Sequence, residues 1–584
     1  MSVGAALRLN RLCGAAWRYA LLALAGVLQA FATAWPWGNK GGASGTLQVL
    51  ALAAALMVLQ GQAEGAASVS AHALPARRRF WQGFRRGWCF ATAWLAATFW
   101  WLFISMHTYG GLPGWLAALA VLLLAAALAL YYAVALGMWC SAWPQGGMVR
   151  RVVLFAALWL LAELCRGVFL TGFPWGAIGY AHVDSALAGY APWIGVYGIS
   201  ALAAASAGCL SAFGSYCWQT VAGRKAAHAH RQNASLRQWG AVAAAVLLMY
   251  GVGAWQKHGQ RQALAAQAAS KTQPALEVAL LQGNIPQDEK FQSGGGMELA
   301  LEWYWQHMQA SSANLVVLPE TALPVFPHML PNDYWQSLQQ RLSQAGKPQA
   351  VLMGMFAGDT EQGYANAAIG MAAGQAQAVG AVAQADLALP PVMQAPYSYA
   401  KYHLVPFGEF VPPGFRWLVD MMRIPLGDQQ RGALAQPRML FQGERLQPNI
   451  CYEDLFGEEL ARSFIDPATA PTILVNMSNI AWFGDTVAID QHRHISRMRA
   501  MELARPMLRA TNTGSTAVID AAGQVQQELP RLTRDVLQAQ VVGNHAEPTF
   551  FAWWAARWGL WPLWLLALAT VLLAWPWRTR GKAE

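Results

Sequence analysis

The chain has 584 residues, of which 55% are hydrophobic and only 12% are charged, and it contains 29 tryptophans. Its mean hydropathy is +0.26. This composition excludes an ordinary soluble protein and indicates a membrane protein. The formal charge of +10 falls mostly in short loops, so it does not indicate nucleic-acid binding, which would need a basic stripe on a soluble domain.

Apolar runs long enough to cross a bilayer of about 30 Å occur eight times along the chain. They lie near 16–36, 46–62, 88–106, 113–138, 152–172, 190–213, 237–255 and 554–576. The first run is expected to remain as an anchor, because further runs follow at once and no clear cleavage site separates them. We therefore predict a seven-span transmembrane bundle over residues 1–260, and an eighth span with a cytoplasmic tail over residues 549–584.

Basic residues in the short loops predict the orientation, since lysine and arginine are retained on the cytoplasmic side. They cluster before span one and in alternate loops, with Lys40 as the clear exception. The sequence between residues 270 and 548 follows an odd number of spans and is predicted to face outward. The basic residues are Arg8, Arg11, Arg77, Arg78, Arg79, Arg85, Arg86, Arg150, Arg151, Arg224, Lys225, Arg231, Arg578, Arg580 and Lys582.

The outward segment alternates short apolar runs with amphipathic stretches, which is typical of strands interleaved with helices. Strands are predicted over 275–281, 314–318, 349–354, 365–371, 473–475 and 516–520, and helices over 298–310, 333–343 and 491–504. Residues 375–396, rich in alanine, glutamine and proline, are predicted to form a loop. The pattern indicates one α/β domain with a single core.

Three segments of this domain each place a reactive side chain beside a predicted strand or loop. Glu320 follows an apolar strand, Lys401 and Glu409 flank a turn-prone loop, and Cys451 precedes two carboxylates. A thiol, a carboxylate and an ammonium group can together perform acyl transfer. The thiol attacks a carbonyl, the carboxylate moves the proton, and the ammonium group lowers the thiol pKa and stabilises the oxyanion.

Each of these residues alone has an ordinary structural explanation. Cys451 is the only cysteine between residues 270 and 548, and a free cysteine is most often a buried hydrophobe. Taken singly, Glu320 is explained as a charge at the start of a helix and Lys401 as a solvated surface cation. Their joint order along the chain favours the catalytic interpretation. The other cysteines lie in or beside apolar stretches: Cys13, Cys89, Cys140, Cys165, Cys209 and Cys217.

The segments 318–320, 401–409 and 450–453 resemble the three catalytic blocks of the nitrilase, or carbon–nitrogen hydrolase, superfamily, in the same order. Together with eight spans and the segments 282–287 and 482–485, they resemble the bacterial apolipoprotein N-acyltransferase family over nearly the whole chain. The resemblance implies a membrane helical bundle carrying an extramembrane αββα sandwich. It places that domain on the periplasmic side of the bacterial inner membrane.

The resemblance also implies roles for individual residues. Glu320 would be the general base and acid, Lys401 the stabiliser of oxyanion and thiolate, and Cys451 the nucleophile that carries a thioester. Glu409 would orient the lysine or assist proton transfer. The supporting residues Tyr452 and Glu453 would shape the pocket beside the nucleophile.

The substrates implied by the resemblance are a phospholipid acyl donor, typically phosphatidylethanolamine, and a diacylglyceryl apolipoprotein acceptor. The acyl chain would pass through the thioester to the N-terminal amine of the acceptor, which is a ping-pong scheme. No cofactor is expected, because the donor ester is already activated. The family resemblance also suggests a monomer.

Apolar segments over 324–330 and 415–425 suggest a lipid route into the domain, because exposed apolar patches often mark membrane contact. The alternative is that they cover the core. The expected lipid contacts are Phe291, Phe326, Trp417, Leu418 and Met422. Two positions depart from the family pattern: Phe291 stands where tryptophan is frequent, and Ile480 where aspartate is common.

Other motifs favour structural over functional interpretations. His492 and His494 lie on different helix faces, so no metal site is expected. Residues 294–296 lack the lysine and serine of a phosphate loop. Glu163 and Arg166 are spaced to pair on one helix face.

The charged run over 497–509 contains Arg497, Arg499, Glu502, Arg505 and Arg509. A solvated or salt-bridged helix face is expected there rather than a phosphate site, since residues three and four apart on a helix can pair.

Two rival functions remain open at this point. A membrane-tethered amidase or nitrilase would pass the same thioester to water. A binding module on a transporter-like bundle would need no thiol chemistry, but intramembrane charges that mark such routes are few.

Overall fold

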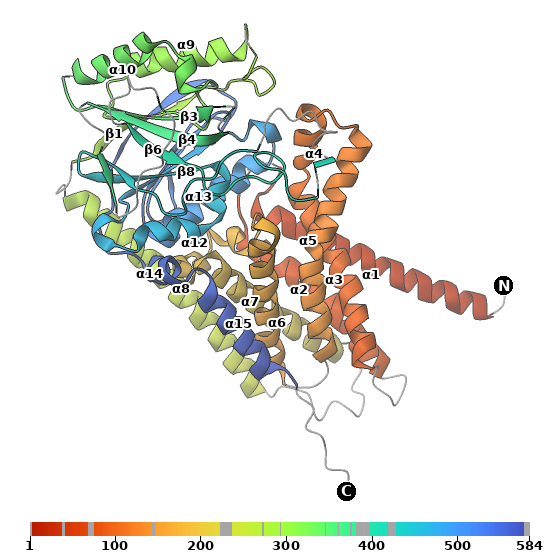
Figure 1. Ribbon diagram of the computed structural model, residues 1–584. Helices are drawn as coiled ribbons and strands as arrows, with labels where there is room; N and C mark the ends of the chain where they lie inside the picture. Colours follow the sequence, from red (N-terminus) through yellow and green to blue (C-terminus); the bar gives the residue numbers. More distant parts are fainter. Residues whose placement is uncertain are drawn as a thin grey trace.

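The computed structural model describes residues 3–37, 41–67, 75–142, 147–221, 236–270, 274–292, 294–344, 346–359, 361, 363–373, 377–380, 389, 396–414, 416–417 and 428–576. Long helices form one half of the molecule and two stacked sheets form the other (Figure 1). The helical half is built from α1 (Val3–Thr33), α2 (Gly45–Ala67), α3 (Ala76–Phe99), α4 (Leu102–Ile104), α5 (Gly114–Ala142), α6 (Met148–Val168), α7 (Ala191–Val221), α8 (Leu236–Ser270), α14 (Phe550–Trp558) and α15 (Trp561–Ala574).

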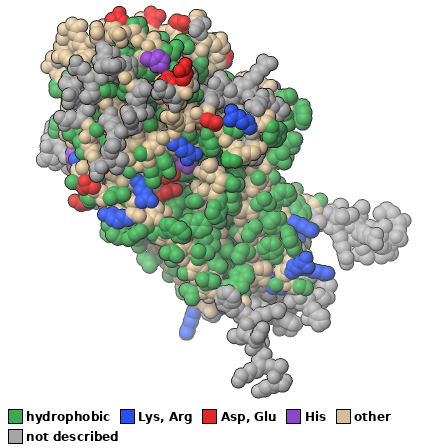
Figure 2. Space-filling view, in the orientation of Figure 1, with side chains coloured by type: hydrophobic (Ala, Val, Ile, Leu, Met, Phe, Trp, Pro, Cys, Tyr) green, Lys and Arg blue, Asp and Glu red, His purple; other side chains and the backbone are tan. Residues whose placement is uncertain are grey.

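Each of the eight predicted spans coincides with an apolar helix or helix pair among the described residues. Five helices are long and apolar enough to cross a bilayer, and two bent pairs, α3 with α4 and the following turn, and α14 with α15, raise the number to seven. The second predicted span falls on the shorter apolar stretch Gly45–Gln60 of α2. Hydrophobic side chains cover most of the helical half on the face that Figure 2 shows, and Lys and Arg side chains are scattered around it.

Thirteen strands among the described residues form two sheets. The first has the order β13-β1-β2-β3-β4-β6 and the second the order β12-β11-β10-β9-β8-β7-β5. The strands are β1 (Leu276–Gln282), β2 (Leu315–Val317), β3 (Ala350–Asp359), β4 (Gly363–Ala372), β5 (Gln377–Val379), β6 (Tyr397–Ala400), β7 (Arg438–Phe441), β8 (Glu444–Ile450), β9 (Ile473–Ser478), β10 (Met507–Thr511), β11 (Ala517–Ile519), β12 (Val525–Glu528) and β13 (Asp535–Val541).

Alternation of side chains along the strands produces the layers. In β1, Val278 and Leu280 point into the core between the two sheets, whereas Ala279 and Leu281 face the helices α9 (Gly296–Ala310) and α10 (Asn332–Gln344). Opposite faces of a strand therefore bury different partners. The outer face of the second sheet packs on α13 (Ala488–Leu503). The result is the expected αββα sandwich, with α9 and α10 outermost (Figure 1).

The core under α13 continues without interruption into the membrane helices. Met498 and Met501 of α13 belong to the same buried cluster as Trp159 of α6 and Ala203 of α7. Because α13 lies between the second sheet and the helical half, the sheet domain is seated on the bundle through an apolar contact rather than through a linker alone.

Several sequence predictions need correction. The predicted loop over 375–396 contains the short strand β5, and six strands, β6, β7, β8, β10, β12 and β13, were not predicted. The pairing expected between Glu163 and Arg166 is wrong. Arg166 instead donates to the carbonyl oxygens of Phe173 and Trp175, while Glu163 accepts from the backbone N–H of Ile178.

The charged run over 497–509 is buried rather than solvated, and it is not one helix, because α13 ends at Leu503 and Arg509 lies on β10. Arg499 and Glu502 form an ion pair of 2.8 Å, and Arg497 pairs with Asp184 of the helical half. Glu502 also accepts a hydrogen bond from the backbone N–H of Val196 in α7. The charges therefore fasten the sheet domain to the bundle.

Candidate active site

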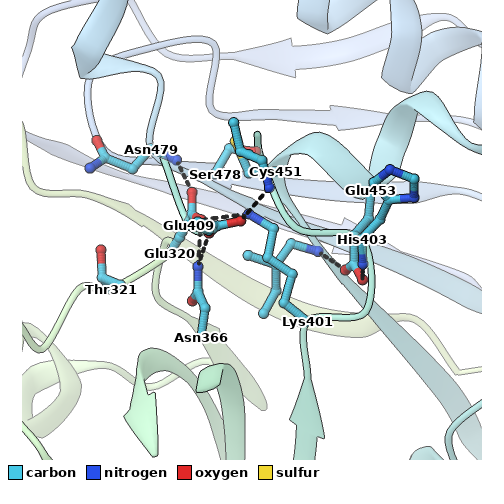
Figure 3. A network of polar contacts seen from close by, with 12 residues as sticks. Glu320, Thr321, Asn366, Lys401, His403, Glu409, Cys451, Glu453, Ser478 and Asn479 are labelled. Carbon is cyan, nitrogen blue, oxygen red and sulfur yellow. Dashed lines mark hydrogen bonds and ion pairs between the residues drawn. The ribbon is translucent and has the colours of Figure 1, made fainter. Parts of the chain in front are cut away.

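The predicted catalytic side chains meet at one edge of the sandwich. Glu320 follows β2, Lys401 follows β6, and Cys451 follows β8, so each lies where a strand ends (Figure 3). β2 and β8 belong to the parallel parts of the two sheets. The carboxyl ends of parallel strands are the usual place for a site in such folds.

A buried ion-pair network links the lysine to both glutamates. Lys401 Nζ lies 3.3 Å from Glu320 Oε1 and 2.8 Å from Glu409 Oε1, and the lysine side chain is 1% exposed. Two carboxylates around one ammonium group raise the pKa of Lys401 even though its burial acts in the opposite direction. Lys401 is therefore a fixed positive charge.

Amide groups hold the two carboxylates in place. Asn366 Nδ2 on β4 donates to Glu320 Oε1 at 2.8 Å and to Glu409 Oε1 at 3.1 Å. The other oxygen of Glu320 accepts from the backbone N–H of Asn479 at 2.8 Å. Asn366 and Asn479 were not among the predicted site residues, because nothing near them in the sequence marks a long-range contact with Glu320.

Cys451 occupies a strained position at the start of a short 3₁₀ turn, Cys451–Leu455. Its φ of 52° lies in the left-handed region, which non-glycine residues seldom adopt. A sharp turn directly after a strand presents the thiol at the sheet edge, as the nucleophile elbow presents a serine in α/β-hydrolases.

Burial raises the pKa of the Cys451 thiol, and the Glu320 carboxylate raises it further, whereas Lys401 lowers it. The ammonium group thus lowers the thiol pKa as expected, but burial and the Glu320 carboxylate outweigh it. The resting thiol is protonated, so a nucleophilic role would require a base that takes its proton. Glu320 is the carboxylate whose charge acts most strongly on that thiol.

Glu453 supports the loop that carries Lys401. One carboxylate oxygen accepts from the backbone N–H groups of Tyr402 at 2.7 Å and His403 at 3.3 Å. The other accepts from the Ile450 N–H at 2.6 Å and the Tyr399 hydroxyl at 2.9 Å. Glu453 thus joins the lysine loop to the nucleophile turn (Figure 3).

Tyr452 and His403 connect the site to the helical half. The Tyr452 hydroxyl donates to the carbonyl oxygen of Gly172 at 3.0 Å, and His403 Nε2 lies 3.1 Å from the carbonyl oxygen of Thr171. His403 also stacks on Phe456 with ring centroids 3.5 Å apart. His403 therefore packs the loop that follows Lys401 against the helical half.

The predicted lipid contacts are only partly described. Phe291 stacks on Phe356, and Phe326 packs against Phe356 and Tyr364, so these side chains form an aromatic cluster above β3 and β4. Trp417 is 64% exposed. Leu418 and Met422 lie outside the described residues.

No group of three or more potential metal ligands occurs within the described ranges. His492 and His494 point to different partners, the carbonyl oxygens of Cys451 and Gly41 respectively.

Comparison with known proteins gives two family matches. Residues 44–209 match the apolipoprotein N-acyltransferase N-terminal domain, and residues 277–549 match the carbon-nitrogen hydrolase domain. The chain is 47% identical to the apolipoprotein N-acyltransferase of Verminephrobacter eiseniae over 556 residues, covering 93% of this chain and 94% of the relative. It is 42% identical to that of Ralstonia nicotianae over 462 residues, covering 78% of this chain and 79% of the relative.

Among solved structures, a mutant amidase of the nitrilase superfamily from Nesterenkonia AN1 aligns with 50% of this chain and 97% of its own. The sequence identity is 16% and the TM-score is 0.33.

Proposed function

This chain belongs to the apolipoprotein N-acyltransferase family, and from that premise we propose that it moves a fatty acyl chain from a phospholipid to the N-terminal amine of a diacylglyceryl apolipoprotein. The observation that carries the proposal is the convergence of Glu320, Lys401 and Cys451 in one buried network. These residues supply the base, the fixed cation and the nucleophile that a two-step acyl transfer needs.

In the first step, the Cys451 sulfur attacks the ester carbonyl of the donor while its proton passes to Glu320. The oxyanion that forms is stabilised by the Lys401 ammonium group, which already carries its charge. The carbon–oxygen bond of the ester then breaks. The departing lysophospholipid oxygen takes the proton from Glu320, and a thioester remains on Cys451.

In the second step, the acceptor amine attacks the thioester and gives a proton to Glu320. The carbon–sulfur bond breaks, an amide forms, and the sulfur regains its proton. Glu320 serves both steps from one position, because Asn366 and the backbone of Asn479 hold its two oxygens. Glu409 keeps Lys401 directed at the reacting carbonyl.

The acyl donor is proposed to be phosphatidylethanolamine, the acceptor a lipoprotein bearing diacylglyceryl-cysteine, and the enzyme a monomer. No cofactor is required by this scheme. The proposed location is the bacterial inner membrane with the sheet domain on the periplasmic side. Three arginines, Arg77, Arg78 and Arg79, open α3, and Arg150 and Arg151 lie in the first turn of α6. These are the helix ends away from the sheet domain, which supports that orientation.

The domain boundaries are likewise proposed, with the bundle over 1–260, the catalytic domain over 270–548 and the final span with its tail over 549–584. We propose that Phe291, Phe326, Trp417, Leu418 and Met422 guide the acyl chain. The aromatic cluster of Phe291 and Phe326 and the exposure of Trp417 support this proposal.

The test is mass spectrometry of the purified protein after incubation with phospholipid and before any acceptor is added. A fatty-acyl adduct is expected on Cys451, and addition of a diacylglyceryl peptide should discharge it to an N-acylated peptide. A free thiol after incubation would count against the transferase. Discharge to free fatty acid at the same rate with or without the peptide would indicate the amidase-like alternative.

A further inference from the structure

A chain of buried hydrogen bonds leads from an arginine to the backbone of the nucleophile. Arg509 Nη2 on β10 lies 2.7 Å from His492 Nδ1, and His492 Nε2 on α13 lies 3.1 Å from the carbonyl oxygen of Cys451. Both side chains are 0% exposed. Neither residue has a role in the two steps described above.

The partners of His492 define its protonation. A guanidinium group can only donate hydrogen bonds, so Nδ1 of His492 has to accept, and Nε2 then carries the hydrogen that is donated to Cys451. Burial and the adjacent Arg509 cation both lower the pKa of His492, which keeps the ring neutral. The direction of the chain is therefore fixed from Arg509 to His492 to the Cys451 carbonyl.

The surroundings hold this chain rigidly. Arg509 also donates to the carbonyl oxygen of Ser515 at 3.0 Å and to Ser496 Oγ at 2.7 Å. The His492 ring stacks on Trp175 of the helical half, with centroids 5.5 Å apart and planes 16° apart. Among the described residues no carboxylate forms an ion pair with Arg509, and Asp454 is reached through Ser496.

The carbonyl that accepts from His492 belongs to the peptide whose N–H is that of Tyr452. That N–H lies in the first turn of the 3₁₀ segment Cys451–Leu455, where helix geometry supplies no carbonyl partner. In acyl-transfer sites with a nucleophile at such a turn, the N–H after the nucleophile is a common oxyanion donor. Donation to the carbonyl end of a peptide strengthens the N–H at its other end, because hydrogen bonds in a chain polarise one another.

We propose that Arg509 and His492 are positioning residues that polarise the peptide between Cys451 and Tyr452, so that its N–H stabilises the tetrahedral oxyanion together with Lys401. The proposal rests on the acyl transfer at Cys451 proposed above. It assigns a function to His492, for which the sequence had indicated only that a metal site with His494 is not expected. It also accounts for a buried arginine without a direct carboxylate partner.

The test compares His492→Phe with His492→Gln in the full-length protein. Phenylalanine keeps the ring against Trp175 but offers no hydrogen bonds, whereas a glutamine can accept from Arg509 and donate to Cys451. We expect thioester formation and its discharge to the peptide each to fall about 10- to 100-fold in His492→Phe, less than the loss of a direct oxyanion donor, and to recover largely in His492→Gln. His494→Phe, on the same helix and equally buried, is the matched control and should be close to wild type.

A second measurement distinguishes loss of polarisation of the Cys451–Tyr452 peptide from a simple displacement of the Cys451 thiol. Alkylation of Cys451 by iodoacetamide forms no oxyanion at a carbonyl, so its rate should stay within about threefold of wild type in His492→Phe while acyl transfer falls. A parallel loss of alkylation and acyl transfer, or full acyl transfer by His492→Phe, would overturn the proposal. Arg509→Met provides the same comparison if His492→Phe does not accumulate. Absence of a thioester on the wild-type protein would instead refute the acyl transfer itself.

Discussion

The hydroxyl of Tyr452, next to the nucleophile, donates a hydrogen bond to the carbonyl oxygen of Gly172 in the segment that follows α6. Gly172 has a φ of 81°, and a Cβ there would lie 2.1 Å from the carbonyl oxygen of Gly167. Only glycine therefore fits this turn. This hydrogen bond connects the turn that carries Cys451 to the segment after α6, and its acceptor is a backbone carbonyl held in a fixed position.

Replacing Gly172 with alanine should weaken this junction. We expect a loss of stability of roughly 1–3 kcal/mol from the strained turn, and a further fall in acyl transfer because Tyr452 loses its anchor. Thermal unfolding in detergent and the rate of thioester formation measure the two effects. Gly240, whose Cβ would meet nothing within 4 Å, provides the control substitution. Equal behaviour of the two alanine variants would contradict the assignment.

Neutralising Glu409 should impair catalysis more than folding. In Glu409→Gln, Lys401 loses the carboxylate that lies 2.8 Å from its Nζ, and it should move toward Glu320. Glu320 then binds the lysine more tightly and accepts a proton less readily. We expect kcat/KM for acyl transfer to fall by about 10²-fold, the size of effect seen when a transition-state charge is poorly placed. Glu444→Gln, a buried carboxylate at the opposite end of β8, should leave the rate near that of wild type.

Cys451→Ser and Cys451→Ala should both abolish thioester formation, with residual transfer at least about 10³-fold below wild type. Their unfolding temperatures should remain close to that of the wild-type protein, because serine is nearly isosteric with cysteine and alanine removes only the sulfur atom. Retention of acyl transfer by either variant would show that another residue carries the chain. Circular dichroism and a radiolabelled-acyl assay provide the two readouts.

Much of this site can be predicted from sequence, because each of the residues proposed to be catalytic lies in a short segment with its own signature. The apolar run before Glu320 and the turn formers around Cys451 mark strand ends. The bounds of the strand leading to Cys451 could not be predicted, because Pro448 interrupts the apolar pattern and Gln447 and Asn449 are polar. In the structure these residues are buried, and Asn449 accepts a hydrogen bond from Asn476 of β9 at 2.6 Å.

The supporting residues could not be predicted in the same way. Contacts with residues 41 or more positions away connect Asn366 and His492 to the site, and Arg509 reaches it only through the His492 side chain. Nothing in the neighbouring sequence distinguishes these three residues from ordinary polar residues. The burial of the 497–509 charges was missed for a related reason. A charged helix normally faces water, but here α13 lies between a sheet and a membrane bundle, so its charges are satisfied across that contact.

A charge at Trp417 should reduce the use of lipid donors selectively. Trp417 is 64% exposed, and Trp417→Glu would place a charge where we propose that the loop meets acyl chains. We expect at least a fivefold rise in KM for phospholipid in vesicles, with iodoacetamide alkylation of Cys451 unchanged. Leu532→Glu, an exposed leucine between β12 and β13, is the control. An unaltered KM for vesicle lipid would mean that this loop covers the domain without touching lipid.

Lys290 gives the protein a measurable dependence of stability on pH. Its Nζ donates to Thr321 Oγ1 at 2.7 Å and to the carbonyl oxygen of Glu320 at 3.3 Å, and burial lowers its pKa to about 7 although Glu320 raises it. An unfolded lysine has a pKa of about 10.4, so between about pH 7 and pH 10.4 the unfolded state binds more protons than the native state. The free energy of unfolding should therefore rise with pH across this window. Below about pH 7 the native lysine is charged as well, and burial of that charge lowers the free energy of unfolding by its full amount.

Lys290→Met isolates this contribution because methionine keeps most of the side-chain volume without titrating. The slope of unfolding free energy against pH from 7.5 to 9.5 should be smaller in the variant by up to about 1.4 kcal/mol per pH unit. Identical slopes for the wild type and Lys290→Met would mean that Lys290 keeps its proton in the native state. In that case the Glu320–Thr321 turn would be held by an ammonium group, and Glu320 would share the field of two cations.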